Sequence, residues 1–407
     1  MSFGIALSGL NAAQADLNTT ANNIANSSTT GFKQSSAQFG DIYQSSAYGL
    51  STQQIGSGVH LTQVAQNFQQ GTVNITNNPL DMAISGSGFF TLSDNGSMVY
   101  SRAGNFSTDR NGYVVNGTGQ ALQVFPPIAG GNGFNTGSLS SLQLSTGDNP
   151  PSASTEIAAQ FNLPSSSTPP QVATFSDTDP NSYNQTTSVT TYDSLGAAHT
   201  TSLFFVAGAT ANDWTMYSTT DGTAMPGSTA LTYSNAGVLT TPVGGAVTLP
   251  PFTPTNGAAP MAMTLDLNKS TQYGSQFAVS SLTQDGYTTG KLTGVAVDSS
   301  GVIQARYTNG QSTALGQLAL TSFANPQGLQ QLGNTSFGET FASGQPIRGS
   351  ANTSNFGQVQ SGALEASNVD LTTQLVNMIT AQRNYQANAQ MIQTDNQLTQ
   401  TIISSIR

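Results

Sequence analysis

The sequence has no cysteine and only two histidines, His60 and His199, among its 407 residues. Without cysteine there is no thiol catalysis, no disulfide bond and no Cys-ligated zinc or iron–sulfur site. Each histidine is expected to be an ordinary packed or exposed side chain. Charge is scarce too, because only 7% of residues are charged, with 9 Lys and Arg against 19 Asp and Glu. The net charge of −10 argues against nucleic-acid binding, which needs clustered cations.

Long apolar runs are also missing. No stretch reaches the roughly 18–20 apolar residues of a membrane-spanning helix, so no membrane insertion is expected. The first basic residue is Lys33, and polar residues interrupt the early apolar ones, so no cleaved secretory signal is expected. A chain with these features is cytoplasmic, or it is exported by a route that needs no cleaved signal.

Two long segments, one near each end of the chain, lack helix-breaking residues. All 17 prolines lie between Pro79 and Pro346, and residues 10–30 and 363–407 contain neither glycine nor proline. Since these residues most strongly penalise a helix interior, we expect a helix at each end and β-rich material between them. Ser367 and Asp370 have the spacing of a capping box before the second helix.

Apolar residues in both terminal segments repeat at heptad spacing, which predicts a helix–helix seam between or within subunits. The predicted seam consists of Phe3, Leu10, Leu17, Ile24, Leu371, Leu375, Met378, Tyr385, Ala389, Ile392, Ile403 and Ile406. Ala6 and Ala13 add small residues three positions after the first two. A helix over the whole of 363–407 would be about 68 Å long and would need a partner. The alternative is two surface helices packed on one globular body.

The middle of the chain shows short alternating apolar runs separated by turn residues, typical of β barrels or sandwiches. The segments 94–96, 110–112 and 307–310 each end in Asn-Gly, which favours hairpin turns. Residues 148–284 contain eight acidic residues, one basic residue and 12 of the 17 prolines, whereas the flanking parts are nearly neutral. This composition predicts that the block is an inserted acidic β domain.

The predicted fold class is α+β and multidomain, with long terminal helices in a coiled-coil-like inner domain and two mainly-β, barrel- or sandwich-like outer domains. The expected division has four parts: 1–27 plus 369–407, helical; 28–70 plus 361–368, connecting; 71–147 plus 285–360, a discontinuous β domain; and 148–284, the insert.

No motif in the sequence supports catalysis, and we predict no enzyme activity, cofactor or metal. Gly86-Ser-Gly88 resembles part of a phosphate loop, but no helix pattern or Lys follows it, so a strand and turn are expected. Asp177 and Asp179 lack the later ligands of a calcium loop, which favours a solvated loop. Lys33 and Arg102 are expected to be isolated.

Short motifs stand out at both ends of the chain, in residues 3–13, 17–26 and 30–33 and in residues 362–371 and 382–388. These motifs resemble the signatures of the flagellar rod and hook protein family. Shorter internal matches lie at 71–73, 80–90, 102–106 and 109–113. The resemblance covers about 1–125 and 285–407. Rod proteins of the family are much shorter, and Thr191–His199 resembles a strand motif of the hook members' outer domain.

Resemblance to the hook members implies a subunit of a hollow helical polymer that joins the flagellar rod to the filament and transmits torque as a flexible joint. It implies that the terminal helices form the inner tube and that the β domains stack outward. The implied partners are further copies of the chain, the rod protein, the hook–filament junction protein, the hook cap and the flagellar type III export apparatus. Two alternatives stay open: a distal rod or junction protein of the same family, and a secreted β-rich adhesin or binding module.

Overall fold

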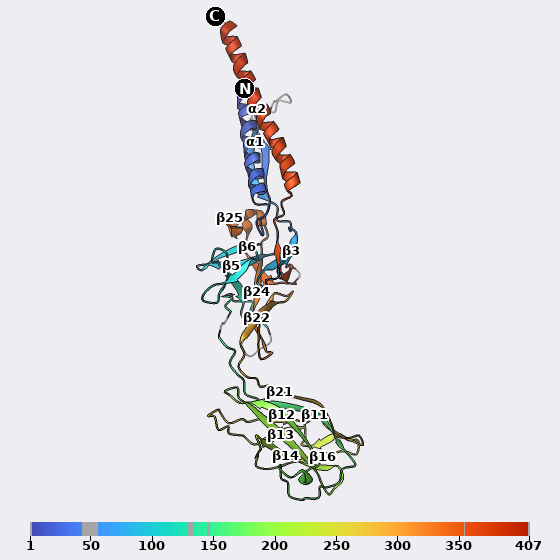
Figure 1. The fold of residues 1–407 in the computed structure, drawn as a ribbon. Coiled ribbons are helices and arrows are strands. Elements are labelled where there is room, and N and C mark those ends of the chain that lie inside the picture. The colour runs from blue at the N-terminus through green and yellow to red at the C-terminus, as the bar shows by residue number, and fades with distance from the viewer. Residues whose placement is uncertain (1, 43–55, 129–132, 145–146, 354, 406–407) are drawn as a thin grey trace. The chain divides into compact units, whose positions relative to one another are not determined.

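The chain folds into two compact units, shown in Figure 1. The structure is a computed structural model that describes residues 2–42, 56–128, 133–144, 147–353 and 355–405. Unit 1 comprises Met1–Thr146, Gly294–Arg306 and Ser312–Arg407, and unit 2 comprises Gly147–Thr293 and Tyr307–Gln311. The four-part division expected from the sequence is finer than these two units and stays a prediction.

Unit 1 contains both terminal helices, α1 (Ser2–Ala25) and α2 (Leu371–Ser405), which pack against each other. The start of α2 differs from the expected one, because Asp370 and not Ser367 caps it. The Asp370 carboxylate accepts a hydrogen bond from the backbone N–H of Thr373 at 3.0 Å. The helix is 35 residues long because the chain before it first pairs as strand β29 (Ala363–Glu365) with β3 (Val73–Ile75).

A two-stranded hairpin of β1 (Ser35–Asp41) and β2 (Val59–Gln66) follows α1 and packs on it. A second small pair joins β4 (Met82–Ser85) to β28 (Gln358–Ser361). These short pairs link the helices to the main sheet of unit 1.

The main sheet of unit 1 has twelve strands, and its central path runs β22-β23-β24-β9-β5-β6-β26-β25. Its strands are β5 (Phe89–Asp94), β6 (Ser97–Ser101), β7 (Phe106–Thr108), β8 (Val114–Asn116), β9 (Ala121–Phe125), β10 (Ser140–Ser141), β22 (Leu292–Val297), β23 (Val302–Tyr307), β24 (Ser312–Ser322), β25 (Gln330–Gly333), β26 (Ser336–Gly338) and β27 (Ile347–Ser350). Short 3₁₀ turns lie at η2 (Pro326–Gly328) and η3 (Phe341–Ser343). The three expected Asn-Gly turns join β5 to β6, β7 to β8 and β23 to β24, so these predictions are confirmed.

Unit 2 is a sandwich of two sheets with one shared apolar core. The five-stranded sheet contains β11 (Glu156–Pro164), β18 (Ala246–Thr248), β19 (Thr264–Asp266), β20 (Thr271–Tyr273) and β21 (Ala278–Gln284). The six-stranded sheet contains β12 (Gln185–Tyr192), β13 (Ala198–Ala207), β14 (Asp213–Thr220), β15 (Thr223–Ala224), β16 (Thr229–Tyr233) and β17 (Leu239–Thr241). A 3₁₀ turn, η1 (Pro180–Ser182), precedes β12.

Strand β11 shows why the sandwich closes. Every second residue of the strand is buried, so Ile157, Ala159, Phe161 and Leu163 all point into the core. The opposite sheet contributes large side chains such as Trp214. Burial of this alternating set is the main stabilising contribution in such a sheet pair. The predicted α+β class, with terminal helices and mainly-β parts, is confirmed.

Neither α1 nor α2 offers an apolar stretch long enough to cross a membrane, and the search covered the described residues alone.

Candidate functional site: paired terminal helices above a buried ion cluster

The two terminal helices meet through small and amide side chains. Ala6 and Ala13 of α1 and Gln374 and Ala381 of α2 are buried. The Cβ of a residue built at Gly9 would lie 2.6 Å from the side-chain oxygen of Asn388, so glycine permits the helices to approach closely there. The single chain thus forms a tight helix pair with little large apolar surface inside it.

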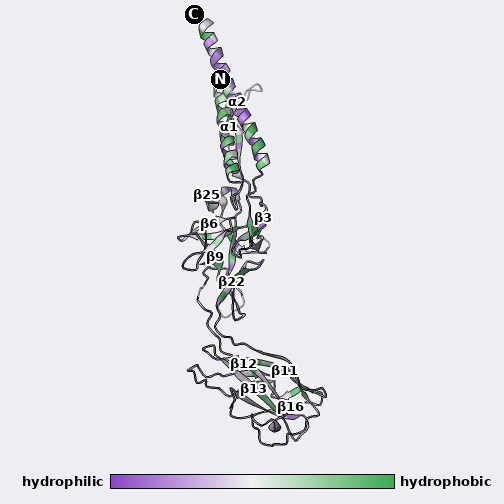
Figure 2. Ribbon diagram, viewed as in Figure 1, coloured by the Kyte–Doolittle hydropathy of each residue, from purple (hydrophilic) through white to green (hydrophobic). Residues whose placement is uncertain are grey.

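The predicted seam residues differ in their exposure within the single chain. Phe3, Leu371, Leu375 and Ile403 are exposed, with exposed fractions of 46%, 47%, 51% and 61%. The half-buried members are Leu10, Leu17, Ile24, Met378, Tyr385, Ala389 and Ile392. Ile406 lies outside the described residues. Figure 2 shows hydrophobic residues along both helices. The seam's role between subunits therefore stays a prediction.

Heptad reasoning missed a second group of apolar side chains on the same helices. Ile5, Leu7, Val376, Ile379, Met391 and Leu398 are all exposed. These residues do not belong to the heptad positions of the predicted seam. The signal that could have found them is the presence of apolar residues on more than one face of each helix. A helix pair that is apolar on several faces has surface available for more than one further helix.

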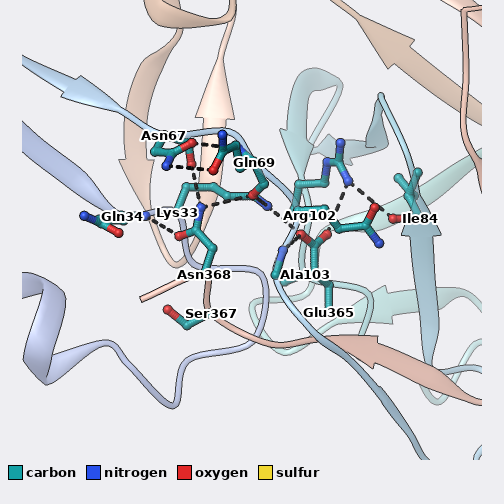
Figure 3. Close-up of polar contacts among 12 residues, drawn as sticks. Lys33, Gln34, Asn67, Gln69, Ile84, Arg102, Ala103, Glu365, Ser367 and Asn368 are labelled. Carbon is teal, nitrogen blue, oxygen red and sulfur yellow. Dashed lines mark hydrogen bonds and ion pairs between the residues drawn. The ribbon is translucent and has the colours of Figure 1, made fainter. Parts of the chain in front are cut away.

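A buried ion cluster lies where the chain enters and leaves the helix pair (Figure 3). The Lys33 ammonium contacts Glu365 Oε1 at 2.5 Å, and Arg102 Nη1 lies 3.3 Å from Glu365 Oε2. Lys33 and Glu365 side chains are fully buried, and that of Arg102 is 5% exposed. The expectation that Lys33 and Arg102 are isolated is therefore wrong.

Backbone groups complete the cluster. Lys33 donates to the carbonyl of Gln69 at 2.9 Å, and the N–H of Gly71 donates to Glu365 Oε1 at 2.9 Å. Arg102 donates to the carbonyl of Gly86 at 2.7 Å, so the Gly86-Ser-Gly88 segment is the turn between β4 and β5. One carboxylate thereby joins four segments that are distant in the sequence.

Asn368 and Gly31 hold the same junction next to the cluster. Asn368 accepts a hydrogen bond from the N–H of Gln34 at 2.8 Å and donates to the carbonyl of Asn67 at 2.8 Å. Gly31 has a φ of 69°, and a Cβ there would lie 2.4 Å from the backbone nitrogen of Ala103. Both the conformation and the close approach require glycine at this position.

The electrostatics of the cluster follow from burial. Burial lowers the pKa of Lys33 below its ordinary value, and the adjacent Glu365 opposes that shift. Burial likewise lowers the pKa of Arg102, with Glu365 acting in the opposite direction. Two cations share one carboxylate, so removal of Glu365 would leave both without a counter-ion.

The motif Thr191–His199 forms the turn between β12 and β13 in unit 2. The Asp193 carboxylate accepts from the N–H groups of Leu195 and Ala197, both at 2.9 Å, and lies 3.2 Å from His199 Nε2. His199 Nδ1 lies 2.6 Å from Asp221. The histidine thus contacts two carboxylates, Asp193 in the β12–β13 turn and Asp221 directly after β14, and links these two turns.

Within the described residues, no group of three or more His, Asp or Glu side chains has the arrangement of a metal site. Asp179 caps η1 by accepting from the N–H of Asn181 at 2.9 Å.

Comparison with known proteins places this architecture in a family. Four family models match: "Flagella basal body rod protein" over 3–33, "Flagellar hook protein FlgE/F/G D1 domain" over 83–167, "Flagellar basal body protein FlaE D2 domain" over 162–287, and "Flagellar basal body rod FlgEFG protein C-terminal" over 360–405. The flagellar hook protein FlgE of Salmonella typhimurium is 39% identical over 420 residues, covering 99% of this chain and 100% of that protein.

The chain belongs to the flagellar hook protein family, FlgE.

Other members of the FlgE family show the same full-length likeness. The Escherichia coli K12 hook protein is 40% identical over 423 residues, covering 99% of this chain and all of that protein. The Rhizobium meliloti protein is 34% identical, with 98% and 97% covered. The crystal structure of Helicobacter pylori FlgE2 shares the fold, with a TM-score of 0.53 at 15% identity, over 72% of this chain and all of that one. As a FlgE-family member, the chain is a structural protein of the flagellar hook.

Proposed function

We propose that the chain is the repeating subunit of a hollow helical polymer that couples the flagellar rod to the filament and transmits torque as a flexible joint. The observation that carries this proposal is full-length likeness to hook proteins of several species. The helix pair supports it, because exposed apolar side chains on several faces suit burial against neighbouring copies. The seam from Phe3 to Ile406 is proposed to lie in those contacts.

The low charge content of α1 and α2 suits the interior of a polymer in which the same helices repeat at close distance. The helices α1 and α2 contain 24 and 35 residues, and their charged residues are Asp16, Arg383 and Asp395. Like charges repeated at every subunit would repel one another, whereas amides and small apolar side chains do not. A lining with few charges also suits passage of unfolded chains of any sequence through the tube.

The remaining partners follow from the family and belong to the same proposal. They are the rod protein at the proximal end, the hook–filament junction protein at the distal end, and the hook cap and type III export apparatus during assembly. The proposal also includes export without a cleaved signal and a role without catalysis, cofactor or metal. The distal rod, junction and adhesin alternatives are not favoured, since the full-length relatives reported above are hook proteins.

Electron microscopy of purified chain tests the proposal directly. Concentrated protein is expected to form hollow helical tubes, and a variant shortened to residues 30–368 is expected to stay monomeric because it lacks both helices. Protein that remains monomeric under all polymerising conditions, or tubes from the shortened variant, would contradict the proposal.

A further inference from the structure

The helix pair needs something that specifies its register. The two long helices contain only three charged residues, so ion pairs can contribute little to setting the register. Three of the buried residues of α1, the small side chains Ala6, Ala13 and Thr20, recur every seven positions. A slip by one heptad would place small residues against the same surface again, at little cost in packing.

Asn23 and Gln374 provide a contact that would not survive such a slip. Asn23 Nδ2 donates to Gln374 Oε1 at 3.1 Å, and both side chains are buried, with exposed fractions of 1% and 2%. Asn23 also exchanges two hydrogen bonds with the backbone of Ser35, at 2.7 and 2.9 Å. Because these bonds hold the Asn23 amide from outside the helix pair, its donor is aimed at one position on α2.

The second close contact between the helices agrees with this register. Gly9 faces Asn388, and Asn23 faces Gln374. From the second pair to the first, α1 steps back fourteen residues while α2 steps forward fourteen, which is two heptads in each helix. The helices are therefore antiparallel with one constant offset, in agreement with the position of both termini at the same end of the pair (Figure 1).

We propose that the buried Asn23–Gln374 pair is the register-determining contact of the terminal helices. It acts as a positioning pair, since a slipped helix would bury the Asn23 amide against an apolar or small side chain. Gln374 Nε2 is buried without a hydrogen-bond partner. A contact that leaves a donor unsatisfied is poorly optimised for stability, as expected where a polar pair serves specificity.

The register also sets which part of α2 projects beyond α1. With this offset, position 395 lies opposite the start of α1, so residues 396–405 continue past it (Figure 1). A one-heptad slip would change that projection by about 10 Å, from the helix rise. The inference deepens the proposed function, because identical projections are needed for identical contacts along a polymer.

Cysteine cross-linking tests the register, and the native chain has no cysteine to interfere. Ala13→Cys is combined in turn with Met378→Cys, Tyr385→Cys and Ile392→Cys, three half-buried α2 positions one heptad apart. The native offset places residue 13 at the level of 384 and 385, and of these two Tyr385 is the half-buried one. On mild oxidation, the 13/385 pair is expected to form the intrachain disulfide at least tenfold faster than either other pair.

The same three cysteine pairs are then introduced into the Gln374→Leu variant and into the Asn23→Leu/Gln374→Leu double variant. We expect the 13/385 preference to fall to about threefold or less, with cross-links appearing at 378 or 392. The double variant is expected to melt at a somewhat lower temperature, because Asn23→Leu also removes both hydrogen bonds to the backbone of Ser35. Gln393→Leu, at an exposed position of α2, is the matched control and should keep the tenfold preference.

The outcomes separate the inference from the proposed function. A tenfold 13/385 preference that persists in the double variant would overturn the positioning role. A fall in melting temperature with an unchanged cross-linking pattern would show a merely structural pair and would also overturn it. Native 13/385 cross-linking in a chain that never forms tubes would contradict the polymer alone.

Discussion

At the scale of single residues, Glu365 is the carboxylate on which two buried cations depend. It contacts both Lys33 and Arg102 and also accepts from the N–H of Gly71. Its backbone carbonyl accepts from Gly31 N–H at 2.8 Å. Main-chain and side-chain contacts of one residue therefore tie the two ends of the chain to the sheet of unit 1.

Replacing that carboxylate should destabilise unit 1 strongly. Glu365→Gln leaves Lys33 and Arg102 buried without a counter-ion, and we expect a loss of about 3–5 kcal/mol in the free energy of unfolding. Asp41→Asn, at an exposed position, removes one negative charge as a control. Denaturant unfolding measures both variants. A loss below about 1 kcal/mol for Glu365→Gln would show that the cluster is dispensable.

The Asp193–His199–Asp221 bridge should make the stability of unit 2 depend on pH. Burial lowers the pKa of His199, but its hydrogen bonds to Asp221 and Asp193 raise it more, so it ends above its ordinary value. Burial raises the pKa of Asp193, but hydrogen bonds from Asn256, Ala197, His199 and Leu195 outweigh this and hold it at about 2. Burial also raises the pKa of Asp221, and its hydrogen bonds again lower it overall.

The sign of each contribution follows from linkage. The histidine contribution is fully present below the unfolded pKa of about 6.5 and is lost as the pH rises through the higher folded pKa. The Asp193 contribution is present above about 3.9 and is lost as the pH falls toward about 2. Calorimetry should therefore find unit 2 most stable between about pH 4 and 6.5. His199→Gln should flatten the alkaline decline, and His60→Gln in unit 1 should leave it unchanged.

At the scale of elements, the terminal helices are marginal by themselves and gain stability from packing. The buried surface between α1 and α2 is mostly alanine and amide, and Leu17 is only half-buried. None of the three apolar core clusters contains a residue of either helix. Packing against further copies is thus expected to contribute more to the helices than to the β parts.

Leu17→Asp should separate assembly from folding. An unpaired carboxylate in a seam between copies would cost several kcal/mol at every subunit, so polymerisation should fail. The β cores should keep their melting temperature, because Leu17 lies outside them. Pelleting and thermal unfolding are measured together, with Leu17→Met as the control that still assembles. A large drop in the melting temperature of the monomer would instead indicate an ordinary core helix.

At the scale of the whole molecule, unit 2 has its own apolar core, and the chain enters and leaves it through paired backbone. The N–H of Asn149 donates to the carbonyl of Gly290 at 2.7 Å, and that of Ser152 donates to Tyr287 at 3.0 Å. Two strands that run side by side at this point can be joined directly without straining unit 1.

Joining Asn149 to Gly290 with the segment between them removed should therefore leave unit 1 folded. Circular dichroism is expected to retain helix and strand signals, and unit 1 should still unfold cooperatively. Under the proposed function, the shortened chain should also form thinner tubes. Loss of the folded strand signal would contradict the independence of the two units, whereas folded chains that form no tubes would limit the loss to assembly.

Much of the element pattern was predictable because its causes are local. The runs without glycine or proline at 10–30 and 363–407 predicted the helices, and three Asn-Gly turns predicted three hairpins. The start of α2 was not predictable in this way. Residues 363–365 suit a helix as well as a strand, and they become a strand because β3, far away in the sequence, pairs with them.

The sequence by itself determined the fold class, the family and the chemistry that is excluded, because these depend on composition, periodicity and short motifs. Only the tertiary structure showed that Lys33, Arg102 and Glu365 form one buried cluster, and that Asn23 faces Gln374. These contacts join residues more than 260 positions apart, as in the pairs of Arg102 with Glu365 and Lys33 with Glu365. No local pattern specifies such a pairing, because it arises only when the two ends of the chain are folded against the same sheet.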